Sequence, residues 1–103
     1  MDLNHVATFV RVVEAGSFTG ASTRLRLPPS SVSRSVAKLE AELGIVLLER
    51  TTRRLSLTDA GRVYYERARE AVAGLDEATA LVGEAAREPS GTVRVAAPPE
   101  VAG

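Results

Sequence analysis

The sequence predicts a mainly α-helical fold in which three short helices and a β-hairpin precede one long helix. Two observations carry this prediction. Apolar residues recur at three- and four-residue spacing in four separate stretches, as they do on the buried face of a helix. Between the third and fourth stretches lie two short β-prone runs, IVLLER and LSLT, joined by the polar residues TTRR. Such a pattern is typical of a hairpin.

The first two helices are expected over residues 3–15 and 18–25. Gly16 ends the first, because glycine readily adopts the left-handed conformation found at helix C-termini. Ser17 is a suitable N-cap for the second. Gly20 lies inside this second helix, where glycine costs about 1 kcal/mol relative to alanine. Packing must therefore stabilise it.

The third helix is expected from about Pro29 to Leu43, with Gly44 as its terminator. Proline is tolerated at the start of a helix. With about 100° between successive residues, one face is apolar and the opposite face is small, polar and basic. The apolar face carries Val32, Val36, Leu39 and Leu43, and the polar face carries Ser30, Arg34 and Lys38, with Ser33 at its shoulder. The helix is thus suited to pack one face on a core and leave the other free.

The long helix is expected to begin with the capping residues Thr58 and Asp59 and to end near residue 87, where EPSG breaks it. Residues on one side of it alternate four- and three-residue steps; we call this set the seam: Tyr64, Ala68, Ala71, Leu75, Ala78, Val82 and Ala85. A heptad pattern favours pairing with a second copy of the chain. The alternative is a lone helix packed on its own domain. Tyr64 and Tyr65 suit a core position equally well, and we favour the core for Tyr65.

Charge is unevenly distributed, although the formal net charge of the 103 residues is zero. Residues 1–57 hold eight Lys and Arg against five Asp and Glu, a net charge of +3. Residues 59–88 hold four Arg against seven acids, a net charge of −3. Because binding surfaces respond to the local potential, a basic N-terminal part remains compatible with a polyanionic partner.

Composition excludes several classes of site. Without cysteine, neither a disulfide nor a thiolate zinc site can form. His5, the single histidine, is expected as a surface or helix-start residue and not as a ligand or base. The N-terminus lacks the pattern of a signal peptide, and no apolar run approaches the ~20 residues of a membrane span. No base is placed to activate a serine, and no glycine-rich phosphate loop is present. We expect no catalytic residue, no metal, no cofactor and no membrane partner, and a cytoplasmic location.

Three helices with a sharp turn between the second and third, followed by a hairpin, predict a winged helix-turn-helix. Its third helix can enter a DNA major groove end-on, because its leading side chains are short and polar. The alternative is a solvated helix face with an ordinary Pro–Ser cap, and this helix alone does not decide between them. The hairpin arginines favour DNA, since arginine binds phosphates and narrow minor grooves. A protein-interaction module built on the long helix, or an enzyme fragment, would be the rival function.

The order of these features resembles the N-terminal region of LysR-type transcriptional regulators. The resemblance is carried by FVRVVEAGSFTGAS, by RL, and by SSVSRSVAKLEAELGIVLLERTTRRLSLTDAG. It implies a winged helix-turn-helix DNA-binding domain over residues 1–58 and a linker or dimerisation helix over residues 59–88. Residues 89–103, with GTVRVAAP, resemble the hinge and first strand of an effector-binding domain that this chain does not contain. The implied partners are an inverted-repeat operator in double-stranded DNA, a second copy of the chain in a homodimer (with a tetramer as the alternative for the full-length form), and a small-molecule effector that binds the missing C-terminal domain.

The resemblance also implies DNA contacts at three places. They fall on Pro29, Ser30, Ser31, Ser33, Arg34 and Lys38 of the third helix, on Ser17 and Thr19 at the start of the second helix, and on Arg50, Arg53 and Arg54 of the hairpin. The family commonly has Ser-Gln-Pro-Ala where this chain has Pro28 to Ser31. The side-chain amide is therefore missing, and Ser33 and Arg34 must carry more of the base reading.

Overall fold

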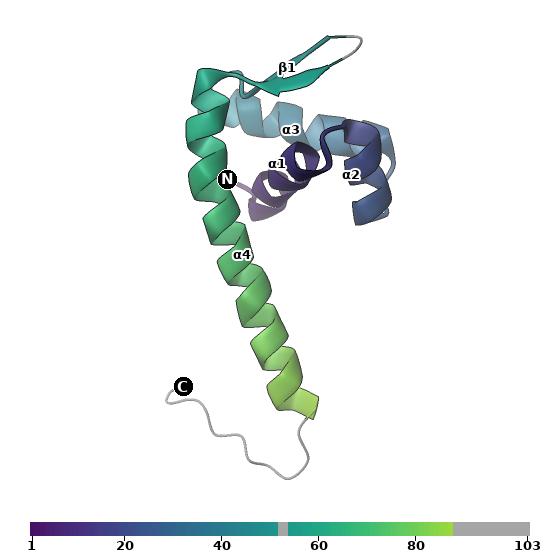
Figure 1. Ribbon diagram of the computed structural model, residues 1–103, viewed down its shortest axis with the longest axis vertical. Coiled ribbons are helices and arrows are strands. Elements are labelled where there is room, and N and C mark those ends of the chain that lie inside the picture. Colours follow the sequence, from purple (N-terminus) through teal and green to yellow (C-terminus); the bar gives the residue numbers. More distant parts are fainter. Residues whose placement is uncertain (52–53, 88–103) are drawn as a thin grey trace. The chain divides into compact units, whose positions relative to one another are not determined.

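The structure is a computed structural model that describes residues 1–51 and 54–87 (Figure 1). Its elements are, in order, α1 (Leu3–Ala15), α2 (Phe18–Leu25), α3 (Pro29–Leu43), β1 (Leu48–Arg50), β2 (Leu55–Leu57) and α4 (Asp59–Arg87). The predicted mainly helical fold, a winged helix-turn-helix followed by a long helix, is confirmed. The chain divides into two units, Met1–Val72 and Ala73–Gly103. The first unit therefore includes residues 59–72 of α4.

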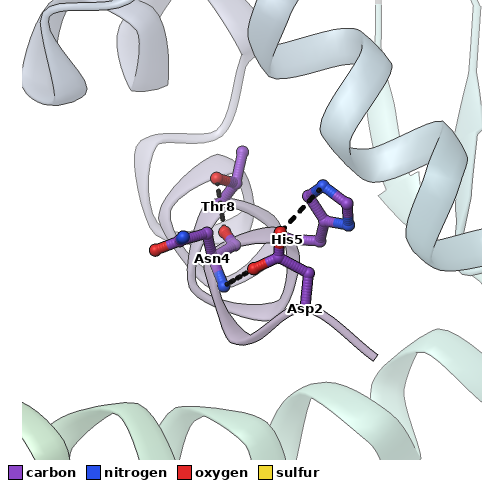
Figure 2. Close-up of polar contacts among 4 residues, drawn as sticks. All are labelled: Asp2, Asn4, His5 and Thr8. Atoms are coloured by element: carbon purple, nitrogen blue, oxygen red, sulfur yellow. Dashed lines mark hydrogen bonds and ion pairs between the residues drawn. The ribbon is translucent and has the colours of Figure 1, made fainter.

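Local caps set the ends of the first two helices. Asp2 accepts a hydrogen bond from the backbone N–H of Asn4 at 2.8 Å and lies within 3.6 Å of His5 Nε2 (Figure 2). Gly16 ends α1 in the left-handed conformation, with φ of 78°. The Ser17 hydroxyl oxygen then accepts the N–H of Gly20 at 2.9 Å and caps α2. The serine and glycine between the first two helices thus act as the sequence predicts.

A single core unites α1, α2, α3 and the first half of α4. The buried apolar residues are Val6, Phe9, Val10, Val12, Ala21, Val32, Val36, Leu39, Leu47, Leu48, Ala68 and Val72. The Phe9 ring lies 5.8 Å from the ring of Tyr64 and 6.3 Å from that of Tyr65, centroid to centroid. Such tilted and edge-on aromatic pairs are favourable beyond the area they bury. Both tyrosines are partly buried against this core and therefore help hold α4 on it, as favoured for Tyr65.

The hairpin is anchored to the helices at its base. β1 and β2 pair antiparallel, with Leu48 opposite Leu57. One carboxylate oxygen of Glu40, on α3, accepts the backbone N–H groups of Leu47 and Leu48 at 2.8 and 3.1 Å. The Thr58 hydroxyl donates to the carbonyl of Val46 at 2.7 Å. These hydrogen bonds fix the base of the hairpin, where its first strand begins and its second strand ends. We call the hairpin (residues 48–57) the wing.

No helix within the described ranges is long and apolar enough to cross a membrane.

Candidate nucleic-acid interface

The turn between α2 and α3 is closed by hydrogen bonds and by one left-handed residue. Arg26 ends α2 with φ of 59°. The backbone N–H of Leu27 donates to the carbonyl of Ser22 at 3.1 Å, and the Ser22 hydroxyl donates to the carbonyl of Leu27. Ser22 is buried, whereas Leu27 is exposed, so the pair of bonds ties a surface residue of the turn to the core side of α2. The turn delivers the chain directly into the first residue of α3.

The leading end of α3 carries no side-chain cap. Pro28 occupies the N-cap position without a side-chain hydrogen bond, and Pro29 is the first helical residue. The Pro28 carbonyl accepts the N–H groups of Ser31 and Val32 at 3.0 and 3.2 Å. Proline supplies no backbone donor but pre-sets the helical φ, so the backbone at the start of α3 is rigid. The first three side chains of the helix, Pro29, Ser30 and Ser31, are short.

The predicted α3 residues lie on the side opposite the core, as the periodicity predicts. Val32, Val36 and Leu39 have no exposed surface. The exposed candidates are Pro29, Ser30, Arg34 and Lys38, and the half-buried ones are Ser31 and Ser33. Within the described part of the chain, neither Arg34 nor Lys38 has a side-chain hydrogen bond or ion pair. The cations on this face thus keep their donors available for a partner.

The start of α2 and the wing line one shallow groove of about 290 Å³. Its walls are Gly16, Ser17, Phe18, Thr19, Arg50, Thr51, Arg54 and Leu55. Two groups of predicted contacts, from α2 and from the wing, are therefore brought together, although they are more than thirty residues apart in sequence. Arg54 adjoins the turn at the end of the wing, where Thr51 N–H donates to its carbonyl at 2.9 Å. Arg53, also predicted to contact DNA, lies outside the described residues.

Arg50 differs from Arg34 and Lys38, because its guanidinium is engaged within the chain. Its Cζ lies 4.4 Å from the centroid of the Phe18 ring. Its Nη1 donates to the Ser33 hydroxyl oxygen at 3.2 Å. The sequence did not predict this contact. No local pattern signals a pairing across residues so distant in the chain.

The seam divides into two parts in the structure. Ala68 is only 7% exposed, buried in the core of its own chain, and Tyr64 is half-buried against Phe9. Burial, and secondly the carboxylate of Glu42, raises the pKa of the Tyr64 phenol above its ordinary value. The remaining five seam residues are exposed: Ala71, Leu75, Ala78, Val82 and Ala85. Only these five stay available to a second copy of the chain.

Comparison with known sequences identifies the family of the chain. Residues 3–62 match the family described as bacterial regulatory helix-turn-helix proteins of the lysR family. The chain is 47% identical over 97 residues to an HTH-type transcriptional regulator of Xanthomonas campestris. It is 45% identical over 98 residues to the HTH-type transcriptional regulator PtxR of Pseudomonas aeruginosa. These alignments cover 94% and 95% of this chain, but only 28% and 31% of the two relatives.

Solved structures show the same arrangement. The DNA-binding domain of BenM, in complex with catB site 1 DNA, superimposes with a TM-score of 0.75 at 36% identity, covering 87% of this chain and 100% of that one. CbnR, a LysR family transcriptional regulator, gives a TM-score of 0.71 at 36% identity over 84% of this chain and 30% of its own. With the family match spanning more than half of its residues, the chain belongs to the LysR family of bacterial regulatory helix-turn-helix proteins.

Proposed function

We propose that this chain is the sequence-specific DNA-binding part of a bacterial LysR-type transcription regulator, and that it binds an inverted-repeat operator as a homodimer. The observation that carries the proposal is the exposed face of α3. Between Pro29 and Leu39 this helix has no acidic residue, and its two cations, Arg34 and Lys38, are exposed. A slim, basic helix start is the shape that fits a major groove.

In this proposal α3 reads bases and its surroundings hold phosphates. Arg34 is long enough to donate to a guanine edge, the commonest specific contact in the major groove. The hydroxyls of Ser30 and Ser33 are short donors and acceptors at the same end. Ser17, Thr19 and the wing arginines would contact the backbone and fix the register of the protein on the duplex.

The homodimer rests on the exposed part of the seam. Leu75 is 52% exposed and Val82 is 69% exposed, and alanines between them allow close approach of a second helix. The relatives that the chain matches are about three times its length. We therefore propose that the whole protein also carries an effector-binding domain after residue 88, senses a small molecule there, and acts in the cytoplasm, where the DNA lies.

The test is a selection of duplexes from a random library, followed by titration of the selected duplex and of a scrambled one. At about 150 mM salt, the selected duplex should bind at least ~1,000-fold more tightly. Arg34→Ala should lower this ratio by about tenfold, since a bidentate base contact is worth ~1–3 kcal/mol. Arg69→Ala is the matched control, because it removes the same charge from α4, where Arg69 pairs with Glu66 at 3.2 Å. Equal affinity of the wild type for both duplexes would refute the proposal.

A further inference from the structure

Arg50 lies where three elements meet. It is the last residue of β1, its guanidinium covers the ring of Phe18 at the start of α2, and it donates to Ser33 on α3. A planar guanidinium can stack on a ring through its face while donating through its edge. Lysine, with its compact ammonium, does not reproduce both contacts. The arrangement therefore depends on arginine and not only on positive charge.

The hydrogen bond from Arg50 also determines which further hydrogen bonds the Ser33 hydroxyl can make. A serine hydroxyl has one O–H donor and two acceptor lone pairs. Arg50 occupies one lone pair with a charged donor at 3.2 Å. A hydroxyl that accepts from a cation becomes a stronger donor itself, because hydrogen bonds in a chain polarise one another. Among the described residues the O–H of Ser33 has no acceptor, so it remains able to donate to one outside the chain.

We infer that Arg50 is a positioning residue for base recognition: it orients the Ser33 hydroxyl as a donor toward acceptors in the major groove, and does not neutralise a phosphate itself. The acceptors of that class are N7 and O6 of guanine, N7 of adenine and O4 of thymine. The inference rests on the proposed function and changes the role of Arg50 within it. The sequence led us to expect Arg50 as a direct DNA contact, equivalent to Arg54.

Salt dependence separates the two roles. Loss of one phosphate contact reduces the slope of log K against log salt by about 0.9, whereas loss of a positioning contact leaves the slope unchanged. The selected and scrambled duplexes are titrated at four salt concentrations with Arg50→Ala, with Arg50→Lys and with Arg54→Ala, which serves as the phosphate-contact reference. Arg50→Ala should keep the wild-type slope and lower the ratio of affinities by about tenfold. A slope reduced by about 0.9 with an unchanged ratio would overturn the inference.

A double-mutant cycle tests whether Arg50 acts through Ser33. Ser33→Ala alone should lower the ratio about as much as Arg50→Ala does, and the double variant should lower it no further. Independent, multiplicative losses would show that the two residues act separately and would contradict the inference. Arg50→Lys keeps the charge and the aliphatic part of the side chain. It therefore controls for the case in which Arg50→Ala acts only by unfolding the wing. Full discrimination by this variant would likewise contradict a role for the guanidinium.

A measurement without DNA distinguishes failure of this inference from failure of the proposed function. In solution NMR, the Phe18 ring should shift the side-chain protons of Arg50 upfield, and Phe18→Leu should abolish that shift. A wild type that shows the shift but does not discriminate between duplexes would refute the proposed function, and this inference with it. A wild type that discriminates but shows no shift would refute the role of Arg50 alone.

Discussion

Gly61 is the residue at which the fold leaves least room for a side chain. A Cβ at this position would lie 2.0 Å from the carbonyl oxygen of Leu47. Atoms of a real side chain cannot approach a backbone oxygen so closely. Gly61 also donates its N–H to the Thr58 hydroxyl at 2.9 Å, within the cap of α4. The glycine therefore lets the first turn of α4 lie directly against the segment that enters the wing.

Gly61→Ala should destabilise the chain by about 2 kcal/mol or more, because backbone must move to admit the methyl group. Gly74→Ala is its matched control: Gly74 lies in the same helix, and a Cβ there meets nothing within 4 Å. That substitution should stabilise by ~0.5–1 kcal/mol, as expected for glycine to alanine inside a helix. Chemical denaturation measures both changes. A stabilising Gly61→Ala would contradict the close approach.

The raised pKa of Tyr64 predicts that the chain loses stability at alkaline pH. Burial raises the pKa of its phenol, so the folded chain holds this proton more tightly than the unfolded chain. A raised pKa contributes stability that is fully present below the ordinary value near 10 and is lost as pH rises through the folded value. Tyr64→Phe should make the free energy of unfolding less dependent on pH in that alkaline range. An unchanged dependence would show that Tyr64 does not titrate with unfolding.

At the scale of elements, the ends of the helices are where sequence reasoning succeeds. α1, α2 and α3 begin and end at the predicted residues, because their signals are local: Ser17 as a cap, Pro29 at a helix start, and Gly16 and Gly44 as terminators. The strands are shorter than the runs IVLLER and LSLT suggest, since only three pairs form in the ladder. β-prone residues alone do not define where the pairing of strands stops.

Contacts between elements are where local patterns fail. The sequence pattern shows only that Glu40 lies within the third helix. In the structure its carboxylate accepts the backbone N–H groups of Leu47 and Leu48, where the chain enters the wing. The contacts of Arg50 with Phe18 and Ser33 likewise join residues that no periodicity relates. The exposed face of α3 was predictable because it follows from the position of the core. The partner of each charged group was not, because it follows from how the elements pack.

The exposed seam of α4 makes a prediction at this scale. Leu75→Glu should convert the proposed homodimer to a monomer, since a carboxylate would be buried against the second helix without a partner. Ala80→Glu adds the same charge at an exposed position about 140° around the helix from Leu75 and should leave the dimer intact. Sedimentation equilibrium measures both. A dimer that survives Leu75→Glu would refute the interface.

In the whole molecule, a net charge of zero is compatible with DNA binding, because the charge is unevenly distributed along the chain. The formal charge is zero over 103 residues, but the basic groups concentrate in residues 1–57. Two copies of the chain would present two α3 helices, and in dimeric helix-turn-helix proteins such helices meet successive major grooves about one helical turn apart. The selected duplex should therefore contain an inverted repeat with that spacing between half-sites.

The central claim is that α3 enters the major groove, and base modification in the selected duplex tests it most directly. Methylation of guanine N7 and replacement of thymine by uracil both alter the major-groove edge. We predict that such changes weaken binding of the wild-type chain in two clusters about one helical turn apart. Arg34→Ala should become insensitive to at least one modified guanine in each cluster. Binding that is indifferent to every major-groove modification, while still selective for the duplex, would contradict the account.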